Sequence, residues 1–204
     1  MTKIKICGLT SKQDALYLHY PQVNFAGIVL FFPKSKRNVT IETAKEILNS
    51  LDSKIHPVAV TVSPTKEQVK QIESAGFHYL QVHGELEEEI INLCHIPIFR
   101  AFNISDMTHF PQMKKYDQVY GYIFDAPNPG SGKIFDWSIL RAVPRNEKLF
   151  ILAGGLNAEN VSDAIKLLHP DVVDVSSGVE NDSGIGKDQD KIQKFIERVH
   201  RSSN

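Results

Sequence analysis

Short apolar runs alternate with longer segments of helical periodicity along the whole chain. The runs are rich in β-branched and aromatic residues, and most are bounded by glycine, proline or polar residues, as expected of buried strands. Eight runs fit this description, at residues 4–7, 25–30, 57–62, 79–82, 96–102, 120–124, 149–152 and 172–175. Strands that alternate with helices pair in parallel, so the pattern predicts an α/β fold of repeated strand–helix units.

The segments between these runs carry helix start signals and one apolar face each. Ser11, Thr40 and Thr65 stand where an N-cap is expected, because a hydroxyl can accept a hydrogen bond from a free amide of the first turn. Eight helical segments can be counted. The segment at residues 105–116 has apolar residues at helical spacing, but Pro111 interrupts it.

Two architectures can hold eight strand–helix units. An open, doubly wound sheet concentrates its functional residues at one switch point. In this chain, polar residues and glycines follow most of the strands, which is typical of a closed barrel whose mouth is built from every strand end. We therefore expect residues 1–204 to form a single domain, a compact (β/α)8 TIM barrel.

The charge balance indicates a small-molecule partner. Lys and Arg number 23 against 24 Asp and Glu, a net charge of −1, so no overall field attracts nucleic acid or an anionic membrane. No apolar run approaches the roughly 20 residues of a membrane helix, and Met1 leads into a strand without a signal-peptide core. We expect a cytoplasmic protein with free thiols at Cys7 and Cys94, the latter in the core.

Two glycine-containing loops predict a phosphate site. Gly154 and Gly155 follow the seventh strand, and Ser177 and Gly178 follow the eighth. In barrels this pair of loops often holds a phosphate through backbone N–H groups and the start of a short extra helix. Ordinary turns are the alternative for either loop alone. Neither Gly132-Lys133 nor Gly186-Lys187 completes a nucleotide-binding P-loop.

Two side chains at strand ends offer proton-transfer chemistry. Cys7 ends the first predicted strand and Asp125 follows the sixth, so in a barrel both would face the same mouth. Cys7 would need activation to become a thiolate, and Asp125 would need a raised pKa to act as an acid. The alternatives are a buried structural cysteine and a carboxylate that caps its own loop.

Three further polar residues are candidate substrate contacts. Arg37 follows the second strand and could hold a carboxylate with both arms of its guanidinium, although Lys34 and Lys36 beside it also suit a solvated basic loop. His83 ends the fourth strand and lacks histidine partners at other strand ends, so we expect a pocket wall or hydrogen-bond donor and no metal. Asp174 lies inside the eighth strand and must be paired if it points inward.

Seven motifs follow one another along almost the whole chain: Lys5 to Thr10, Pro33 to Val39, Gln81 to Gly84, Phe124 to Ala126, Gly132 to Trp137, Leu152 to Asn157, and Val173 to Glu180. Together they resemble those of the phosphoribosylanthranilate isomerase family of tryptophan biosynthesis. The chain departs from the family at Glu85-Leu86, where Asp-Glu is common, and in a slightly longer segment at 181–187, which leaves the register of Lys187 open.

The resemblance implies a (β/α)8 barrel that needs no cofactor. It also implies an Amadori rearrangement of the phosphosugar N-(5-phosphoribosyl)anthranilate to 1-(2-carboxyphenylamino)-1-deoxyribulose 5-phosphate. Asp125 would be the general acid and Cys7 the general base, while Arg37 would bind the anthranilate carboxylate. The substrate-binding residues expected in this way are Arg37, His83, Gly154, Gly155, Asp174, Ser177 and Gly178. The oligomeric state stays open.

Three other functions compete with this interpretation. A dual-substrate isomerase that also acts on the histidine-pathway aminoaldose resembles the family but has aspartate where this chain has Cys7. A ribulose-phosphate epimerase would need several metal-binding residues at strand ends, and only His83 is suitably placed. A non-catalytic phosphosugar-binding barrel could lack Cys7 or Asp125, and both are present.

Overall fold

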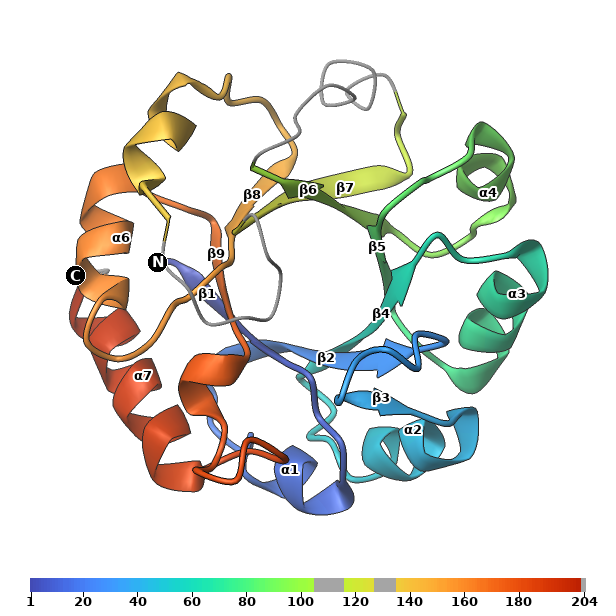
Figure 1. Ribbon diagram of the computed structural model, residues 1–204, viewed down its shortest axis with the longest axis horizontal. Coiled ribbons are helices and arrows are strands. Elements are labelled where there is room, and N and C mark those ends of the chain that lie inside the picture. Colours follow the sequence, from blue (N-terminus) through green and yellow to red (C-terminus); the bar gives the residue numbers. More distant parts are fainter. Residues whose placement is uncertain (105–115, 127–134, 203–204) are drawn as a thin grey trace.

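Eight parallel strands close into a barrel surrounded by helices (Figure 1). The computed structural model describes residues 1–104, 116–126 and 135–202. Strand β1 pairs with both β9 and β2, which closes the ring and excludes the open sheet. The barrel prediction is therefore confirmed. Its strands are β1 (Lys3–Cys7), β2 (Val23–Leu30), β4 (His56–Val62), β5 (Tyr79–His83), β6 (Ile98–Asn103), β7 (Val119–Asp125), β8 (Leu149–Leu152) and β9 (Val172–Val175).

A short ninth strand, β3 (Asn38–Val39), was not predicted. It pairs in parallel with the last residues of β2, and two residues are too few to show a period in the sequence. The side chain of Asn38 accepts a hydrogen bond from the Phe32 amide at 2.7 Å. Both contacts hold the loop after β2 against the barrel, and that loop carries Arg37.

The helices begin at the predicted caps. Side chains of Ser11, Thr40 and Thr65 accept hydrogen bonds from first-turn amides, as expected. All but the last residue of the predicted segment 105–116 lies outside the described residues. The helices are α1 (Lys12–Leu16), α2 (Ile41–Leu48), α3 (Lys66–Ala75), α4 (Glu88–Leu93), α6 (Val161–Leu168) and α7 (Gln189–Ser202), with 3-10 helices η1 (Trp137–Ala142) and η2 (Ser177–Val179).

The connection from β7 to β8 departs from the expected eight α-helices, because its described part holds only the 3-10 helix η1. Val143 follows η1 in an extended conformation, the conformation that a residue before proline favours, and Pro144 cannot donate the next helical hydrogen bond. The 3-10 helix η1 therefore ends at Ala142.

Successive side chains along each strand point to opposite faces of the sheet, which divides the core into two parts. Residues such as Ile4 and Ile6 face the helices, whereas Phe25, Phe99 and Ile151 fill the barrel interior. Aromatic rings pack at the amino-terminal end of the interior, where Phe99 stacks on Tyr79 with ring centroids 4.7 Å apart. This packing forms a floor opposite the carboxyl ends of the strands. Cys94 is buried, as predicted.

Within the described ranges, no helix is both long enough and apolar enough to cross a membrane.

The cap of α3 tests how much local structure contributes to stability. Thr65 and Gln68 form a reciprocal capping box there. We expect Thr65→Ala to lower the free energy of unfolding by about 1 kcal/mol, because an amide of the first turn loses its acceptor. Urea denaturation measures the change. Lys70→Ala, on the exposed face of the same helix, is the control and should change it by less than about 0.5 kcal/mol. Equal losses in the two variants would contradict a specific capping effect.

Candidate active site

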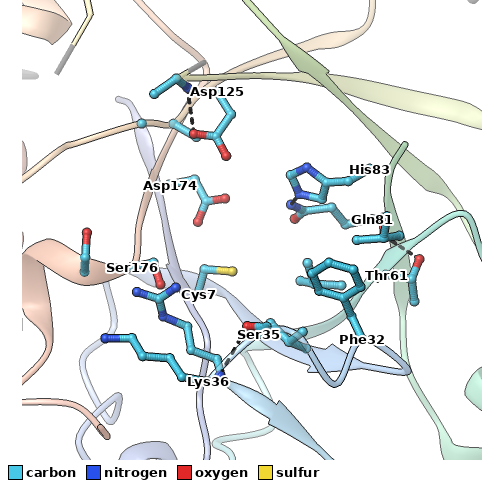
Figure 2. Close-up of a pocket in the computed structure, with 18 of the residues that line it drawn as sticks. Cys7, Phe32, Ser35, Lys36, Thr61, Gln81, His83, Asp125, Asp174 and Ser176 are labelled. Atoms are coloured by element: carbon cyan, nitrogen blue, oxygen red, sulfur yellow. Dashed lines mark hydrogen bonds between the residues drawn. The ribbon is translucent and has the colours of Figure 1, made fainter. Parts of the chain in front are cut away.

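A cavity of about 570 Å³ opens at the carboxyl ends of the strands. Figure 2 shows Cys7, Asp125 and Asp174 pointing into it, with His83 and Gln81 across the opening. Side chains that are far apart in sequence meet here because all strands run in the same direction. The predicted site residues that line the cavity are Cys7, Arg37, His83, Asp125, Gly154, Gly155, Asp174 and Ser177. Gly178 does not line it.

A buried ion pair lies below the cavity. Lys5 Nζ donates to Asp174 Oδ2 at 2.7 Å, and the lysine side chain is 0% exposed. The two residues are direct neighbours in the β1–β9 register. The expectation that an inward-facing Asp174 must be paired is thus confirmed. Lys5 was not predicted as a site residue, although its position two before Cys7 in a strand places both side chains on one face.

Cys7 lies beside this ion pair, and Gly27 on β2 leaves room for it. A Cβ added to Gly27 would meet Cys7 Sγ at 2.8 Å and Lys5 Nζ at 3.1 Å. Burial raises the pKa of the Cys7 thiol, and Asp174 adds to this effect, whereas the ammonium groups of Lys5 and Lys187 oppose it. The pKa of the thiol therefore lies above its ordinary value, because the two ammonium groups only partly offset burial.

Asp125, at the end of β7, has the properties of a carboxylic acid that can donate a proton near neutral pH. Its pKa is raised to about 6, mainly by burial and also by Asp174, while the Ala126 amide and nearby cations lower it. Its Oδ1 accepts from the Ala126 amide at 2.8 Å, so it also caps its own loop. Gly154 packs here, since a Cβ on it would lie 2.5 Å from the Ala126 nitrogen.

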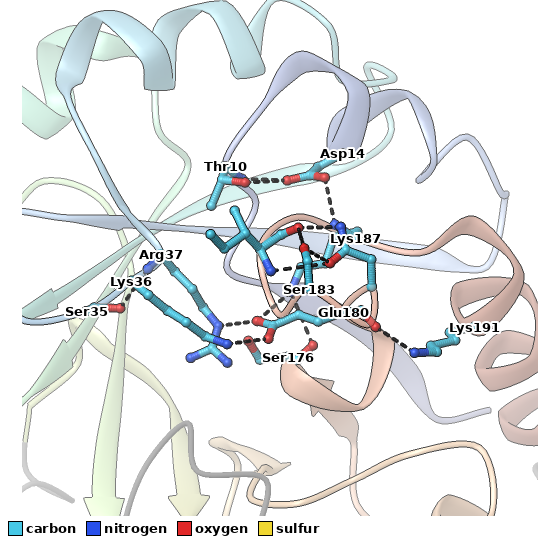
Figure 3. A network of polar contacts seen from close by, with 12 residues as sticks. Thr10, Asp14, Ser35, Lys36, Arg37, Ser176, Glu180, Ser183, Lys187 and Lys191 are labelled. Carbon is cyan, nitrogen blue, oxygen red and sulfur yellow. Dashed lines mark hydrogen bonds and ion pairs between the residues drawn. The ribbon is translucent and has the colours of Figure 1, made fainter.

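Arg37 belongs to an ion-pair network (Figure 3), whereas Lys34 and Lys36 beside it are exposed. Its Nε donates to Glu180 Oε1, and Lys36 Nζ donates to Glu180 Oε2 at 3.0 Å. Burial raises the pKa of Glu180, but Arg37, Lys36 and Lys187 together lower it by more. The pKa of Glu180 therefore lies below its ordinary value. Glu180 thus ties the loop after β2 to the segment after β9. A role for Glu180 was not predicted, because Lys36 and Arg37 are more than 140 positions away from it in the sequence.

The segment 181–187 connects the end of η2 to α7, and its register against the family stays open. Glu180 and Lys187 form an antiparallel bridge that folds the intervening residues into a turn. The Lys187 amide donates to Asp14 Oδ1 at 2.8 Å, and its Nζ donates to the Ser176 carbonyl at 3.2 Å. Burial lowers the pKa of Lys187 to about 8. Lys187 is therefore buried next to the segment that follows β9.

The loops after β8 and β9 leave backbone amides available. Within the described part of the chain, the N–H groups of Gly155, Ser177 and Gly178 donate to no other backbone carbonyl and to no side chain. Gly178 lets the two loops touch, because a Cβ there would lie 2.1 Å from the Leu156 carbonyl oxygen. Gly155 and Ser177 line the cavity beside this contact, so an anion can reach them.

His83 forms a neutral wall of the cavity. Its Nε2 lies 2.8 Å from Gln81 Nε2, and since an amide nitrogen only donates, the imidazole accepts. Burial, together with Lys5 and Arg100, lowers the pKa of His83 to about 4. Across the described residues, no three or more His, Cys, Asp or Glu side chains are grouped to hold a metal ion.

Comparison with known proteins identifies the family. The family model described as N-(5'phosphoribosyl)anthranilate (PRA) isomerase matches residues 4–198. The N-(5'-phosphoribosyl)anthranilate isomerase of Thermoanaerobacter pseudethanolicus is 37% identical over 205 residues, covering 98% of each chain. That of Streptococcus pneumoniae is 38% identical over 200 residues, covering 98% of this chain and 96% of the relative.

Solved structures agree with this assignment. The phosphoribosyl anthranilate isomerase of Thermotoga maritima superposes with a TM-score of 0.85 at 34% identity, covering 98% of this chain and all of that one. A phosphoribosyl anthranilate isomerase in complex with reduced 1-(o-carboxyphenylamino)-1-deoxyribulose 5-phosphate has a TM-score of 0.83 at 32% identity, with the same coverage. The chain therefore belongs to the N-(5'-phosphoribosyl)anthranilate isomerase family, and it is an isomerase of tryptophan biosynthesis.

Proposed function

We propose that Asp125 and Cys7 carry out the proton transfers by which this isomerase converts N-(5-phosphoribosyl)anthranilate to the 1-deoxyribulose 5-phosphate product. The observation that carries the proposal is the pairing of a carboxyl whose pKa is about 6 with a half-buried thiol at the mouth of one barrel. General acid–base catalysis needs such groups, with pKa values that suit donation and abstraction.

Asp125 is the general acid of the first step. It donates its proton to the furanose ring oxygen, the bond from that oxygen to C1 breaks, and the amine nitrogen lone pair forms the C=N bond of a Schiff base. With a pKa of about 6, roughly one tenth of Asp125 is protonated at pH 7, whereas an ordinary aspartate would be almost entirely ionised.

Cys7 is the general base of the second step. Its thiolate takes the proton from C2, the released electron pair forms the C1=C2 bond, and the C=N electrons return to nitrogen. The resulting enolamine gains a proton at C1 and loses one from its hydroxyl oxygen to become the ketone. The positive iminium acidifies C2, so a thiolate is basic enough for the transfer.

The two acidic groups of the substrate fix its position over Asp125 and Cys7. The amides of Gly155, Ser177 and Gly178 suit a phosphate, because backbone N–H groups at a loop and a helix start bind anions. Arg37 lies in the loop after β2, on the other side of β1 from β9, and suits the anthranilate carboxylate. His83 and Gly154 complete the cavity wall, and Asp174 contributes through Lys5.

Two observations favour this proposal over its alternatives. Cys7 stands where dual-substrate isomerases of this type carry aspartate, which favours a dedicated enzyme. Cys7 and Asp125 are both directed into the cavity, which favours an active enzyme over a binding module. We also infer a cytoplasmic location, since Cys7 must remain reduced to act and both cysteines are free thiols.

The acid–base assignment predicts the effect of removing each group. We expect Cys7→Ser and Asp125→Ala each to lower kcat by about 10²- to 10⁴-fold, the contribution of a positioned acid or base. Loss of the anthranilate-type fluorescence of the substrate measures turnover. Cys94→Ala, far from the cavity, is the control and should keep the wild-type rate. Full activity in the Cys7→Ala, Asp125→Ala double variant would overturn the mechanism.

The Glu180 network predicts an effect on substrate binding. Glu180→Gln removes the carboxylate that orients Arg37. We expect KM to rise by about ten-fold and kcat to change by less than about three-fold, as when binding common to substrate and transition state is lost. Glu89→Gln, which removes an exposed carboxylate paired with Lys66, is the matched control. A fall in kcat with unchanged KM would place Glu180 in the chemical step instead.

The raised pKa of Asp125 predicts a cost in stability at neutral pH. The folded-state pKa of about 6 exceeds the ordinary 3.8, so the folded protein binds this proton more tightly and loses stability as pH rises through 6. Between pH 5 and pH 7.5, the free energy of unfolding of wild type should fall by about 1 to 1.5 kcal/mol more than that of Asp125→Asn. Urea denaturation at both pH values measures this. Asp117→Asn, at an exposed site, should behave as wild type, and parallel curves for all three proteins would refute the prediction.

A further inference from the structure

The acid–base mechanism leaves Lys5 without a role, although Lys5 is the largest fully buried side chain in the described part of the chain. A buried ammonium is costly unless it is paired. Asp174 supplies that partner at 2.7 Å, yet its other oxygen, Oδ1, is buried without a hydrogen-bond partner. A hydrophobic pair could fill this space with no such cost. The ion pair therefore points to a function other than stability.

The position of Lys5 supplies that function. The atoms Lys5 Nζ and Cys7 Sγ lie 3.1 and 2.8 Å from one point above Gly27, so the ammonium is within the roughly 6 Å over which a charge acts strongly on a neighbouring group. The side chain of Lys5 cannot move away, because it is enclosed by the barrel interior and held by Asp174. Its charge is thus fixed beside the sulfur.

We propose that Lys5, held by Asp174, is a positioning residue that stabilises the thiolate of Cys7 for proton abstraction. The inference rests on the proposed role of Cys7 as the base. Lys5 is not itself a proton donor or acceptor here, because Asp174 and Cys7 together raise its pKa despite the opposing effect of burial. It remains an ammonium throughout the reaction and acts through its charge alone.

Other charged groups also face Cys7 and set the background. Asp174 on β9 disfavours the thiolate, while Lys187 before α7 favours it. Asp125, His83 and Arg37 line the same cavity. Lys5 is the strongest of the influences that lower the Cys7 pKa, so removing its charge should raise that pKa. A merely structural role of Lys5 would leave the Cys7 pKa unchanged.

The test measures Cys7 directly, without turnover. Iodoacetamide alkylates thiolates, so the pH dependence of Cys7 alkylation, followed by mass spectrometry of its peptide, reports its pKa. We expect Lys5→Met to raise that pKa by about one to three units. Lys5→Met should also lower kcat/KM by about ten-fold or more at pH 7.5, with KM within about three-fold of wild type.

A second variant covers the case in which Lys5→Met leaves Asp174 buried and unpaired and does not fold. Lys5→Met combined with Asp174→Asn removes both charges, and its Cys7 pKa should lie above wild type and below Lys5→Met. A Cys7 pKa that is unchanged or lowered in Lys5→Met, or in the double variant where Lys5→Met does not fold, would overturn the inference. Retained activity in Cys7→Ser would instead refute the proposed base while leaving the alkylation result intact, so the two failures are distinguishable.

Discussion

The ion pair of Lys5 and Asp174 is the constraint around which the mouth of the barrel is arranged. The two buried charges, 2.7 Å apart, attract each other, and their effects largely cancel at long range. A group close to one of them still responds to that charge. Cys7 lies beside the lysine end. Asp125 responds to the aspartate end, which adds to the effect of burial in raising its pKa. One ion pair thus favours thiolate at one group and proton retention at the other.

Glu180 provides a second organising contact, between loops that follow strands on opposite sides of β1. It holds Arg37 and Lys36 from the loop after β2, and Lys187 Nζ lies 3.7 Å from the same carboxylate. Three cations therefore share one buried carboxylate. In the proposed function, the carboxylate and the phosphate of the substrate would add negative charge beside these cations.

The sequence was sufficient for the strands and for most cavity residues, since strand periodicity and position at a strand end are local signals. The eight strands and the lining positions of Cys7, Asp125 and Arg37 follow from such signals. Glu180 could not be identified in that way, because its importance depends on Arg37, which is distant in sequence. Lys5 carries one local signal, its position two residues before Cys7, but its partner Asp174 is 169 positions away. The same applies to β3, whose two residues are ordered by pairing with β2 and by no pattern of their own.

The site and the core divide the barrel between function and stability. Below the ion pair, Phe25, Phe99 and Tyr79 pack edge to face or stacked and close the interior. This floor covers the amino-terminal side of the interior, so the burial that raises the pKa of Asp125 and of Cys7 is maintained in part by residues remote from the mouth. Substitutions in the floor would then act on these pKa values through hydration of the ion pair, as well as on stability through lost packing. The proposed acid and base consequently depend on the full depth of the barrel and not only on the loops at its mouth.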